Sequence, residues 1–298
     1  MSDDLHDHDR GLAHDLALVE NRLRDRRRLL GLLATGGVVA GVAGAAAAQS
    51  RGGRMPGRQA PTTTGTTTTT TTTGTTSSAC VADPTETNGP YPADGTNSVN
   101  GTISNVLATS GIVRSDIRSS FGISTNTAAG VPLVLTIKLV NTNASCAVLA
   151  GYAIYIWHCT REGAYSLYSS GIQNENYLRG VQVTDSSGQV TFTTVFPGCY
   201  SGRYPHIHFE VFPSLAVATG KSNAVLTSQF AMPRDVASAV YSGATGYSAS
   251  VANLAKVTTS SDGVFGDNTA AQIAAMTPTL AGSVANGFTG SVVVGVAR

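Results

Sequence analysis

Residues 191–212, TFTTVFPGCYSGRYPHIHFEVF, decide the fold expected for this chain of 298 residues. β-branched and aromatic residues stand on both sides of a Pro197-Gly198 pair, which predicts a strand, a tight turn and a second strand. Successive side chains of a strand point to opposite faces, so His206 and His208 share one face. Two imidazoles on one face can reach the same metal ion.

A nearby tyrosine narrows the choice of metal. Tyr200 precedes His206 in the same stretch, and Arg203 lies between them. An anionic phenolate oxygen suits a hard, highly charged ion, so two imidazoles with at least one phenolate favour ferric iron. A His-x-His pair by itself is weak evidence, because zinc or copper would suit it equally well and many such pairs bind no metal.

The beginning of the chain has the composition of an export leader. Residues 1–28 are charged and polar and end in three arginines, whereas residues 29–48 are uncharged and rich in Leu, Val, Gly and Ala. Arg26-Arg27, followed after one residue by Leu29-Leu30, is similar to the signal read by the twin-arginine export machinery, and the alanines before Gln49 suit cleavage. We expect residues 1–48 to be such a signal region; a retained membrane anchor and a cytoplasmic helix are the alternatives.

A linker and a folded domain are expected after the leader. Residues 62–76 consist of thirteen Thr and two Gly, a composition without apolar surface to bury, so residues 49–79 are predicted to be a disordered linker. Residues 80–298 are long enough for one good core. Acidic and basic residues nearly balance there, and no basic patch indicates nucleic-acid binding. Contact with a membrane is expected only through an uncleaved leader.

The cysteines fit an exported domain. All four follow residue 79, and an even number outside the cytoplasm suggests two disulfides. The sequence cannot fix the pairing. We predict Cys159–Cys199, because both flank candidate site residues, which leaves Cys80–Cys146 to tie the start of the domain to its interior. Buried free thiols are the alternative.

Strand patterns dominate the chain after residue 80. Short apolar or alternating runs are separated by turns rich in Gly, Pro and Ser, which predicts an all-β domain, a β-sandwich with few short helices. The sequence contains no phosphate-binding glycine loop and no Gly-x-Ser-x-Gly elbow. Strands are expected at residues 131–140, 150–158, 181–185, 189–193, 225–230 and 287–296, and helices at 233–241 and 269–276.

A second tyrosine completes a family pattern. Trp157 is followed by Gly163-Ala164-Tyr165, then by Pro197-Gly198-Cys199-Tyr200, and then by Arg203 and the sequence His-Ile-His-Phe at 206–209. In order and spacing these residues resemble the intradiol ring-cleavage dioxygenases, the non-haem Fe(III) family of catechol and protocatechuate 3,4-dioxygenases. The resemblance covers about residues 80–233, and the domain that it implies extends over residues 80–298. It implies the sandwich fold of the catalytic domain in that family.

The resemblance also implies a role for individual residues. The two tyrosines and two histidines would bind non-haem Fe(III), and Tyr200 would also accept a proton from the substrate. Arg203 would stabilise negative charge on the substrate, and Gln229 would line the site. Gly89, Pro90 and Tyr91 are expected to wall the substrate pocket. The implied iron ligands are Tyr165, Tyr200, His206 and His208.

These residues lead to one expected function and two competing ones. The resemblance implies an exported dioxygenase that inserts both atoms of O2 into an aromatic ortho-diol, such as catechol or protocatechuate, to give a muconate-type diacid. The first alternative is a secreted β-sandwich binding module with a structural zinc or copper site, which has no need of Tyr165 or Tyr200. The second is a cell-surface protein with a Thr-rich stalk and an inactive domain. We expect His158 to be structural rather than a ligand.

Overall fold

The structure is a computed structural model that describes residues 80–298. The signal region predicted at 1–48 and the linker predicted at 49–79 lie outside the described residues. Within the described part of the chain, no helix is both long enough and apolar enough to cross a membrane.

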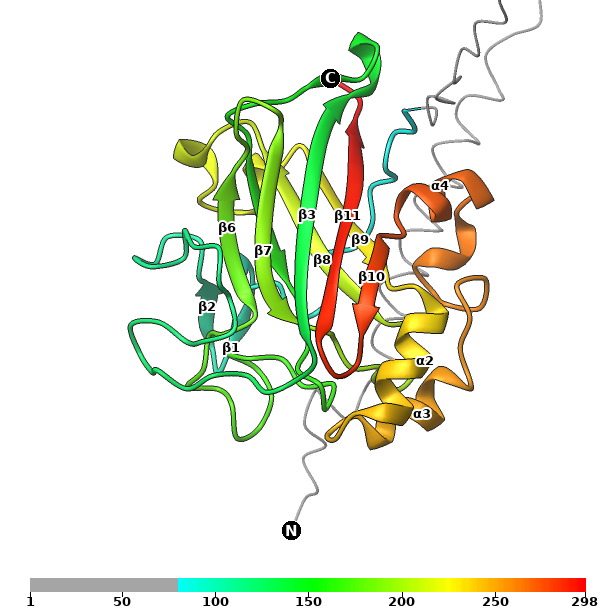
Figure 1. Cartoon of the computed structure of the whole chain (residues 1–298). Coiled ribbons are helices and arrows are strands. Elements are labelled where there is room, and N and C mark those ends of the chain that lie inside the picture. Colours follow the sequence, from blue (N-terminus) through cyan, green and yellow to red (C-terminus); the bar gives the residue numbers. More distant parts are fainter. Residues whose placement is uncertain (1–79) are drawn as a thin grey trace, which may run out of the picture. The chain divides into compact units, whose positions relative to one another are not determined.

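Two β-sheets pack face to face (Figure 1). One sheet has four antiparallel strands in the order β6 (Arg179–Val183), β5 (Ala153–Trp157), β8 (His206–Phe212) and β9 (Leu226–Ala231). The other has the order β10 (Thr279–Ser283), β11 (Gly287–Val296) and β3 (Pro132–Asn141), and both β7 (Gln189–Val195) and the short β4 (Ala147–Val148) pair with β3. A separate hairpin consists of β1 (Asp94–Val99) and β2 (Thr102–Asn105). The predicted all-β sandwich is confirmed.

The main core lies between the two sheets. Alternate residues of β3, from Leu133 to Leu139, are fully buried there and share one apolar cluster with Ile207, Phe209 and Val211 of β8. Because strand side chains alternate, His206 and His208 point to the opposite face of β8. That outer face carries a second apolar cluster around Tyr155 and Trp157. The histidine pair therefore lies outside the sandwich core, on the covered outer face of the four-stranded sheet.

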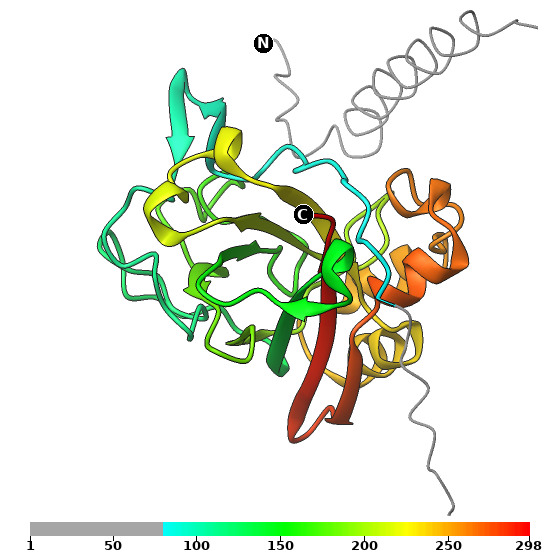
Figure 2. The same cartoon turned by 90° about the horizontal axis from the view of Figure 1, so that it is seen from above.

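Three short α-helices form a cap beside the sheets, and we call residues 232–278 the cap (Figures 1 and 2). The helix predicted at 233–241 is α2 (Arg234–Gly243), and the one predicted at 269–276 is α4 (Ala270–Ala275). A reciprocal capping box of Thr269 and Gln272 begins α4. The structure adds α3 (Ser248–Leu254), which the sequence did not indicate.

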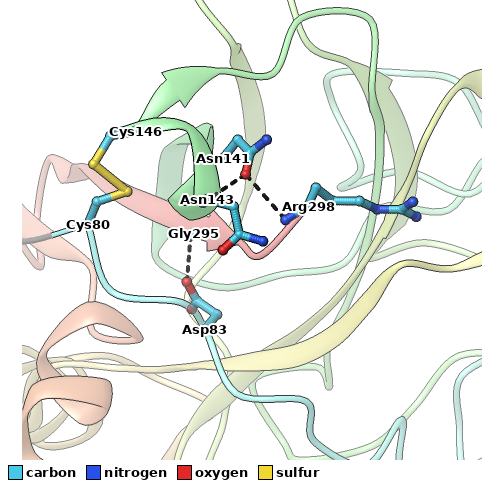
Figure 3. The surroundings of a disulfide bond; sticks show 7 residues. All are labelled: Cys80, Asp83, Asn141, Asn143, Cys146, Gly295 and Arg298. Carbon is cyan, nitrogen blue, oxygen red and sulfur yellow. Dashed lines mark hydrogen bonds between the residues drawn. A yellow bond between two sulfur atoms is a disulfide. The ribbon is translucent and has the colours of Figure 1, made fainter.

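The start of the described chain is an extended segment that we call the strap, residues 80–93. The disulfide Cys80–Cys146 attaches it close to β4, as predicted (Figure 3). Asp83 then pairs with β11: its N–H donates to the carbonyl of Gly295, and the Gly295 N–H donates to Asp83 Oδ2 at 2.7 Å. The strap is thus fixed to the sandwich both covalently and by backbone pairing.

Residues 191–212 do not form the strand, tight turn and strand that the sequence predicted. Its two predicted strands exist as β7 and β8, but they belong to different sheets, so no tight turn joins them. Residues 196–205 cross from one sheet to the other instead. Gly198 is needed in this crossing, because a Cβ there would lie 2.6 Å from the carbonyl oxygen of Arg161. The Pro-Gly pair therefore permits a close approach between two loops.

Candidate metal centre

Strand β8 supplies two imidazoles that face each other. The Nε2 atoms of His206 and His208 lie 3.1 Å apart, and both side chains are buried. Their rings meet edge to face, at 4.7 Å between centroids and 79° between planes. The regular geometry of the strand brings the pair together, as the His-x-His spacing predicted.

Two loops supply the tyrosines. Tyr165 follows β5, where its N–H donates to Ser169 Oγ, and Tyr200 lies in the crossing between the sheets. Each hydroxyl lies 3.4 Å from His206 Nε2. Gly163 has a φ of +92°, and a Cβ there would lie 3.0 Å from the Cβ of Tyr200, so this glycine lets the two loops approach. The structure thus brings all four predicted ligands together.

The tautomer of His206 leaves a lone pair on its Nε2. His206 Nδ1 lies 2.5 Å from the carbonyl oxygen of Tyr204, an acceptor, so the proton resides on Nδ1 and Nε2 carries a lone pair. Burial, followed by the charge of Arg203, lowers the pKa of His206 to about 3. Burial and then His206 lower the pKa of His208 well below its usual range. Both imidazoles are therefore neutral at physiological pH, the form that binds metals.

The donor set suits a hard cation. Burial and the neighbouring Tyr200 raise the pKa of Tyr165 well above its ordinary value, so its phenol ionises only if a positive charge is bound beside it. Among residues 80–298, no group of three or more His, Cys, Asp or Glu side chains is arranged to hold a metal, so the tyrosines are needed to complete a ligand set. Two phenolates with two imidazoles fit Fe(III) better than zinc or copper.

Packing holds the ring of His208 in addition to the contact of its Nε2 with His206. The ring stacks on Trp157, with 4.7 Å between centroids and 7° between planes, and Nδ1 has no hydrogen-bond partner. On the strap, Gly89 has a φ of +71°, and a Cβ there would lie 3.0 Å from Cε1 of His208. Only glycine fits this position without displacing the histidine.

The predicted pocket residues lie next to the candidate ligands. The ring of Tyr91 packs on Tyr165 at 4.9 Å and on Tyr168 at 5.2 Å. The carbonyl of Pro90 accepts a hydrogen bond from Asn97 of β1, which fixes the strap where it passes the site. Gly89, Pro90 and Tyr91 are therefore adjacent to the four rings, and their contact with a substrate stays a prediction.

A buried polar group adjoins the rings. Arg203 donates through Nη2 to Gln229 Oε1 at 2.7 Å, and Gln229 faces His208 directly across β8 and β9. Arg203 Nε donates to Asp262 Oδ2 at 3.0 Å, an ion pair in which both side chains are almost fully buried. Burial opposes ionisation of Asp262, but the charge and hydrogen bonds of Arg203 outweigh it and lower the pKa of this carboxyl. Asp262 was missed by sequence reasoning, because a single acid in a Ser-Ser-Asp-Gly turn gives no sign of a distant partner.

His158 is structural, as expected. Its Nδ1 lies 2.8 Å from the carbonyl oxygen of Cys159, and its Nε2 lies 2.7 Å from Thr194 Oγ1 on the opposite sheet. Burial lowers its pKa to about 4. A neutral, fully bonded histidine joins the two sheets here.

The predicted Cys159–Cys199 disulfide is wrong. Both cysteines are buried free thiols. Cys159 Sγ donates to the carbonyl of Gly198, and Cys199 Sγ donates to the carbonyl of Arg203. Each thiol thus points at a backbone oxygen, and burial raises the pKa of both to about 12, which keeps them protonated. Proximity to site residues in the sequence did not mean that the sulfurs are bonded.

Comparison with known proteins agrees with this geometry. A protein-family model described as Dioxygenase matches residues 117–219, a range that contains all four candidate ligands. No curated protein matches the chain.

The fold is shared with a solved structure. An intradiol ring-cleavage dioxygenase from Tetranychus urticae is 23% identical, with a TM-score of 0.55, and the match covers 73% of this chain and 95% of that chain. The dioxygenase domain of a carbohydrate-binding fusion protein from Streptomyces sp. SirexAA-E is 21% identical, with a TM-score of 0.43, and the match covers 73% and 99% of the two chains. The chain is therefore similar to the intradiol ring-cleavage dioxygenases in its fold and in the segment that the family model matches.

Proposed function

We propose that this chain is an exported non-haem Fe(III) dioxygenase that inserts both atoms of O2 into an aromatic ortho-diol of the catechol or protocatechuate type, giving a muconate-type diacid. The observation that carries the proposal is the convergence of two phenol oxygens on the facing imidazoles of His206 and His208, at 3.4 Å from His206 Nε2. Tyr165, Tyr200, His206 and His208 would hold the iron. When bound, the iron supplies Lewis-acid and template chemistry.

The two tyrosines are suited to different tasks. Tyr165 is 1% exposed and its backbone is fixed by Ser169, so it would remain a permanent ligand. Tyr200 is only partly buried and lies just before the exposed Ser201 in the crossing loop. Its Oη would both hold the iron and accept a proton from a hydroxyl of the incoming diol.

The remaining polar residues would bind and orient the diol. Arg203 places a buried positive charge beside the rings, where it stabilises negative charge that develops on the substrate. Gln229, directly opposite His208 on β9, fixes the guanidinium and lines the site. Gly89, Pro90 and Tyr91 would form an apolar wall over the aromatic ring of the substrate.

Visible spectroscopy of the purified full-length protein tests the metal centre. We expect a wine-red band from tyrosinate-to-iron charge transfer after loading with ferric iron, and a shift to longer wavelength when catechol is added without oxygen. Tyr165→Phe should lose most of the band. Tyr152→Phe is the matched control, because the Tyr152 N–H donates to Thr184 Oγ1 and its partly buried side chain packs against the sandwich core instead of the site. Colourless protein that holds stoichiometric zinc would favour the binding-module alternative instead.

Product analysis tests the reaction. With catechol and ¹⁸O₂, both labelled atoms should appear in the diacid, and mass spectrometry would detect them. Labelling of one oxygen only, or formation of a quinone, would contradict ring cleavage by a dioxygenase. Parallel assays with protocatechuate distinguish a neutral from a carboxylated diol as the preferred substrate.

Export is proposed from the leader and supported by the disulfide. Cys80–Cys146 would persist outside the reducing cytoplasm. The twin-arginine route carries folded proteins, so iron could be loaded before export. Replacing Arg26 and Arg27 by Lys should retain the protein in the cytoplasm, as fractionation and immunoblotting would show; unchanged export would remove this part of the proposal.

A further inference from the structure

The carboxylate of Asp262 is the most heavily bonded acid at the site. It is 2% exposed and accepts from two nitrogens of Arg203 and from three backbone N–H groups. Oδ2 accepts from Arg203 Nε at 3.0 Å and from the Tyr204 N–H at 2.6 Å. Oδ1 accepts from Arg203 Nη2 at 3.4 Å, from the Val264 N–H at 2.8 Å and from the Phe265 N–H at 3.1 Å.

The turn that carries Asp262 is itself well fixed. The Asp262 N–H donates to the carbonyl of Thr258, and the Gly266 N–H donates to the carbonyl of Asp262. A Cβ at Gly266 would lie 2.9 Å from the carbonyl oxygen of Ser260, so the turn is tightly closed. This turn belongs to the cap and lies outside residues 117–219, the range matched by the family model. A segment beyond the sandwich thus reaches the buried arginine.

The guanidinium of Arg203 is held at two edges. Asp262 engages Nε and Nη2, while Gln229 Oε1 engages Nη2. Gln229 is in turn fixed by its own donation to the carbonyl of Thr87 on the strap. A planar group bound at two separate edges cannot rotate about its stem, and its charge is then directed before any substrate arrives.

We propose that Asp262 is a positioning residue that sets the orientation of the Arg203 guanidinium for ring cleavage. This inference rests on the proposed function. Asp262 has hydrogen bonds to Arg203 and to three backbone N–H groups but none to the four rings or their hydroxyls, so we expect its main effect to pass through Arg203. Losing it should slow the chemical step while leaving the binding of iron and of the diol largely intact.

The first test needs neither iron nor turnover. In ¹⁵N-labelled iron-free protein, the Nε–H signal of Arg203, assigned with Arg203→Lys, should exchange slowly with water. In Asp262→Asn that signal should shift and exchange at least tenfold faster, because an amide nitrogen cannot accept the bonds that a carboxylate accepts. Asp267→Asn, the same substitution at an exposed site in the same segment, is the control and should leave the Arg203 signal unchanged. An unchanged Arg203 signal in Asp262→Asn would overturn the proposal.

The second test is kinetic. Per bound iron, Asp262→Asn should lower kcat with catechol about a hundredfold, with KM and the anaerobic catechol band changed less than about threefold. Asp262→Glu retains the charge and should recover part of the rate, and it replaces Asp262→Asn if that variant fails to fold. The double variant Asp262→Asn/Arg203→Gln should be no slower than Arg203→Gln alone, because both act through one group.

The two possible failures are distinguishable. If the wild-type protein cleaves no diol, the proposed function fails, while the exchange of the Arg203 Nε–H still decides whether Asp262 orients the guanidinium. If the wild-type protein turns over but Asp262→Asn keeps its full kcat per bound iron, or if the losses in the double variant multiply, the positioning role is refuted and Asp262 is structural.

Discussion

The strap and the cap both reach the four-ring site, but they hold it by different forces. The strap contributes packing and backbone bonds: Gly89 lies under His208, Tyr91 lies on Tyr165, and Thr87 binds Gln229. The cap contributes the buried charge of Asp262, and its Phe265 also meets the ring of His206 edge to face, with 6.5 Å between centroids. Packing fixes where the rings stand, whereas charge fixes how Arg203 is directed. Damage to the strap should therefore impair stability and iron retention, and damage to the cap should impair turnover per bound iron.

The largest expected effect of breaking the strap comes from its disulfide. Cys80 and Cys146 are separated by 66 residues. In the chain-entropy model, a disulfide that closes a loop of that length stabilises the folded state by about 4 kcal/mol, because it restricts the unfolded chain. We expect the double variant Cys80→Ser/Cys146→Ser to lose about that much free energy of unfolding in urea titrations. Its kcat per bound iron should stay within about twofold of wild type. If this double variant instead lost kcat at unchanged stability, the strap would serve turnover and not stability.

The next effect concerns Asp83, the strap residue paired with β11. Burial raises its pKa to about 7, although the Gly295 N–H opposes the shift. The folded state therefore prefers the protonated acid. The contribution of Asp83 to the free energy of unfolding is largest below about pH 4 and is lost as the pH rises through about 7. Asp83→Asn, which is always neutral, should be about 2 kcal/mol more stable than wild type at pH 8 and nearly equal at pH 4. If Asp83→Asn were more stable than wild type by the same amount at both pH values, ionisation of Asp83 would not be the cause.

A smaller effect is expected where the strap touches His208. Gly89→Ala combines backbone strain at φ +71° with a 3.0 Å contact to the imidazole, and we expect about tenfold weaker iron binding in competition with a chelator. Gly101→Ala is the matched control: it has a φ of +80° but open space around the new methyl group. If Gly101→Ala weakens iron binding as much as Gly89→Ala does, backbone strain alone accounts for the weaker binding. The contact with His208 would then be unimportant.

The smallest effect is expected from Arg234, which stabilises the cap. Arg234 donates to the carbonyls of Val257 and Leu254, just before the turn that carries Asp262. Arg234→Ala should cost about 1 kcal/mol in thermal unfolding and lower kcat per bound iron less than about threefold, without loss of iron. Lys256→Ala, at an exposed position in the same segment, should be neutral. Loss of iron in Arg234→Ala would show that the cap, like the strap, fixes the rings.

Much of the sandwich could be predicted because its strands carry their own signal. The alternation from Leu133 to Leu139 predicts β3, and the spacing of His206 and His208 predicts two side chains on one face. The capping residues Thr269 and Gln272 mark the start of α4. These patterns depend only on local periodicity and end chemistry, which a sequence displays directly.

The elements that were missed lack such a signal. β10 is almost entirely exposed and gains its place only by pairing with β11. α3 is a short Ser- and Ala-rich helix without a side-chain N-cap bond. The ion pair of Arg203 with Asp262 joins residues 59 positions apart, so no spacing rule reveals it. The same holds for the cysteines, where three-dimensional distance rather than position beside site residues decides the pairing.

The parallel pairing of β11 with β3 affects the order in which the protein can fold. β11 is inserted between β10 and β3, where Phe288 pairs with Leu133 from much earlier in the chain. Contacts between such distant segments form slowly, because a long loop must close first. During synthesis, the edge of β3 that later pairs with β11 stays unpaired until β11 has been made. An unpaired strand edge can pair with another chain, which leads to aggregation. A chain shortened before residue 287 should therefore yield aggregates rather than a smaller sandwich, and chaperone demand should be greatest just before that residue is made.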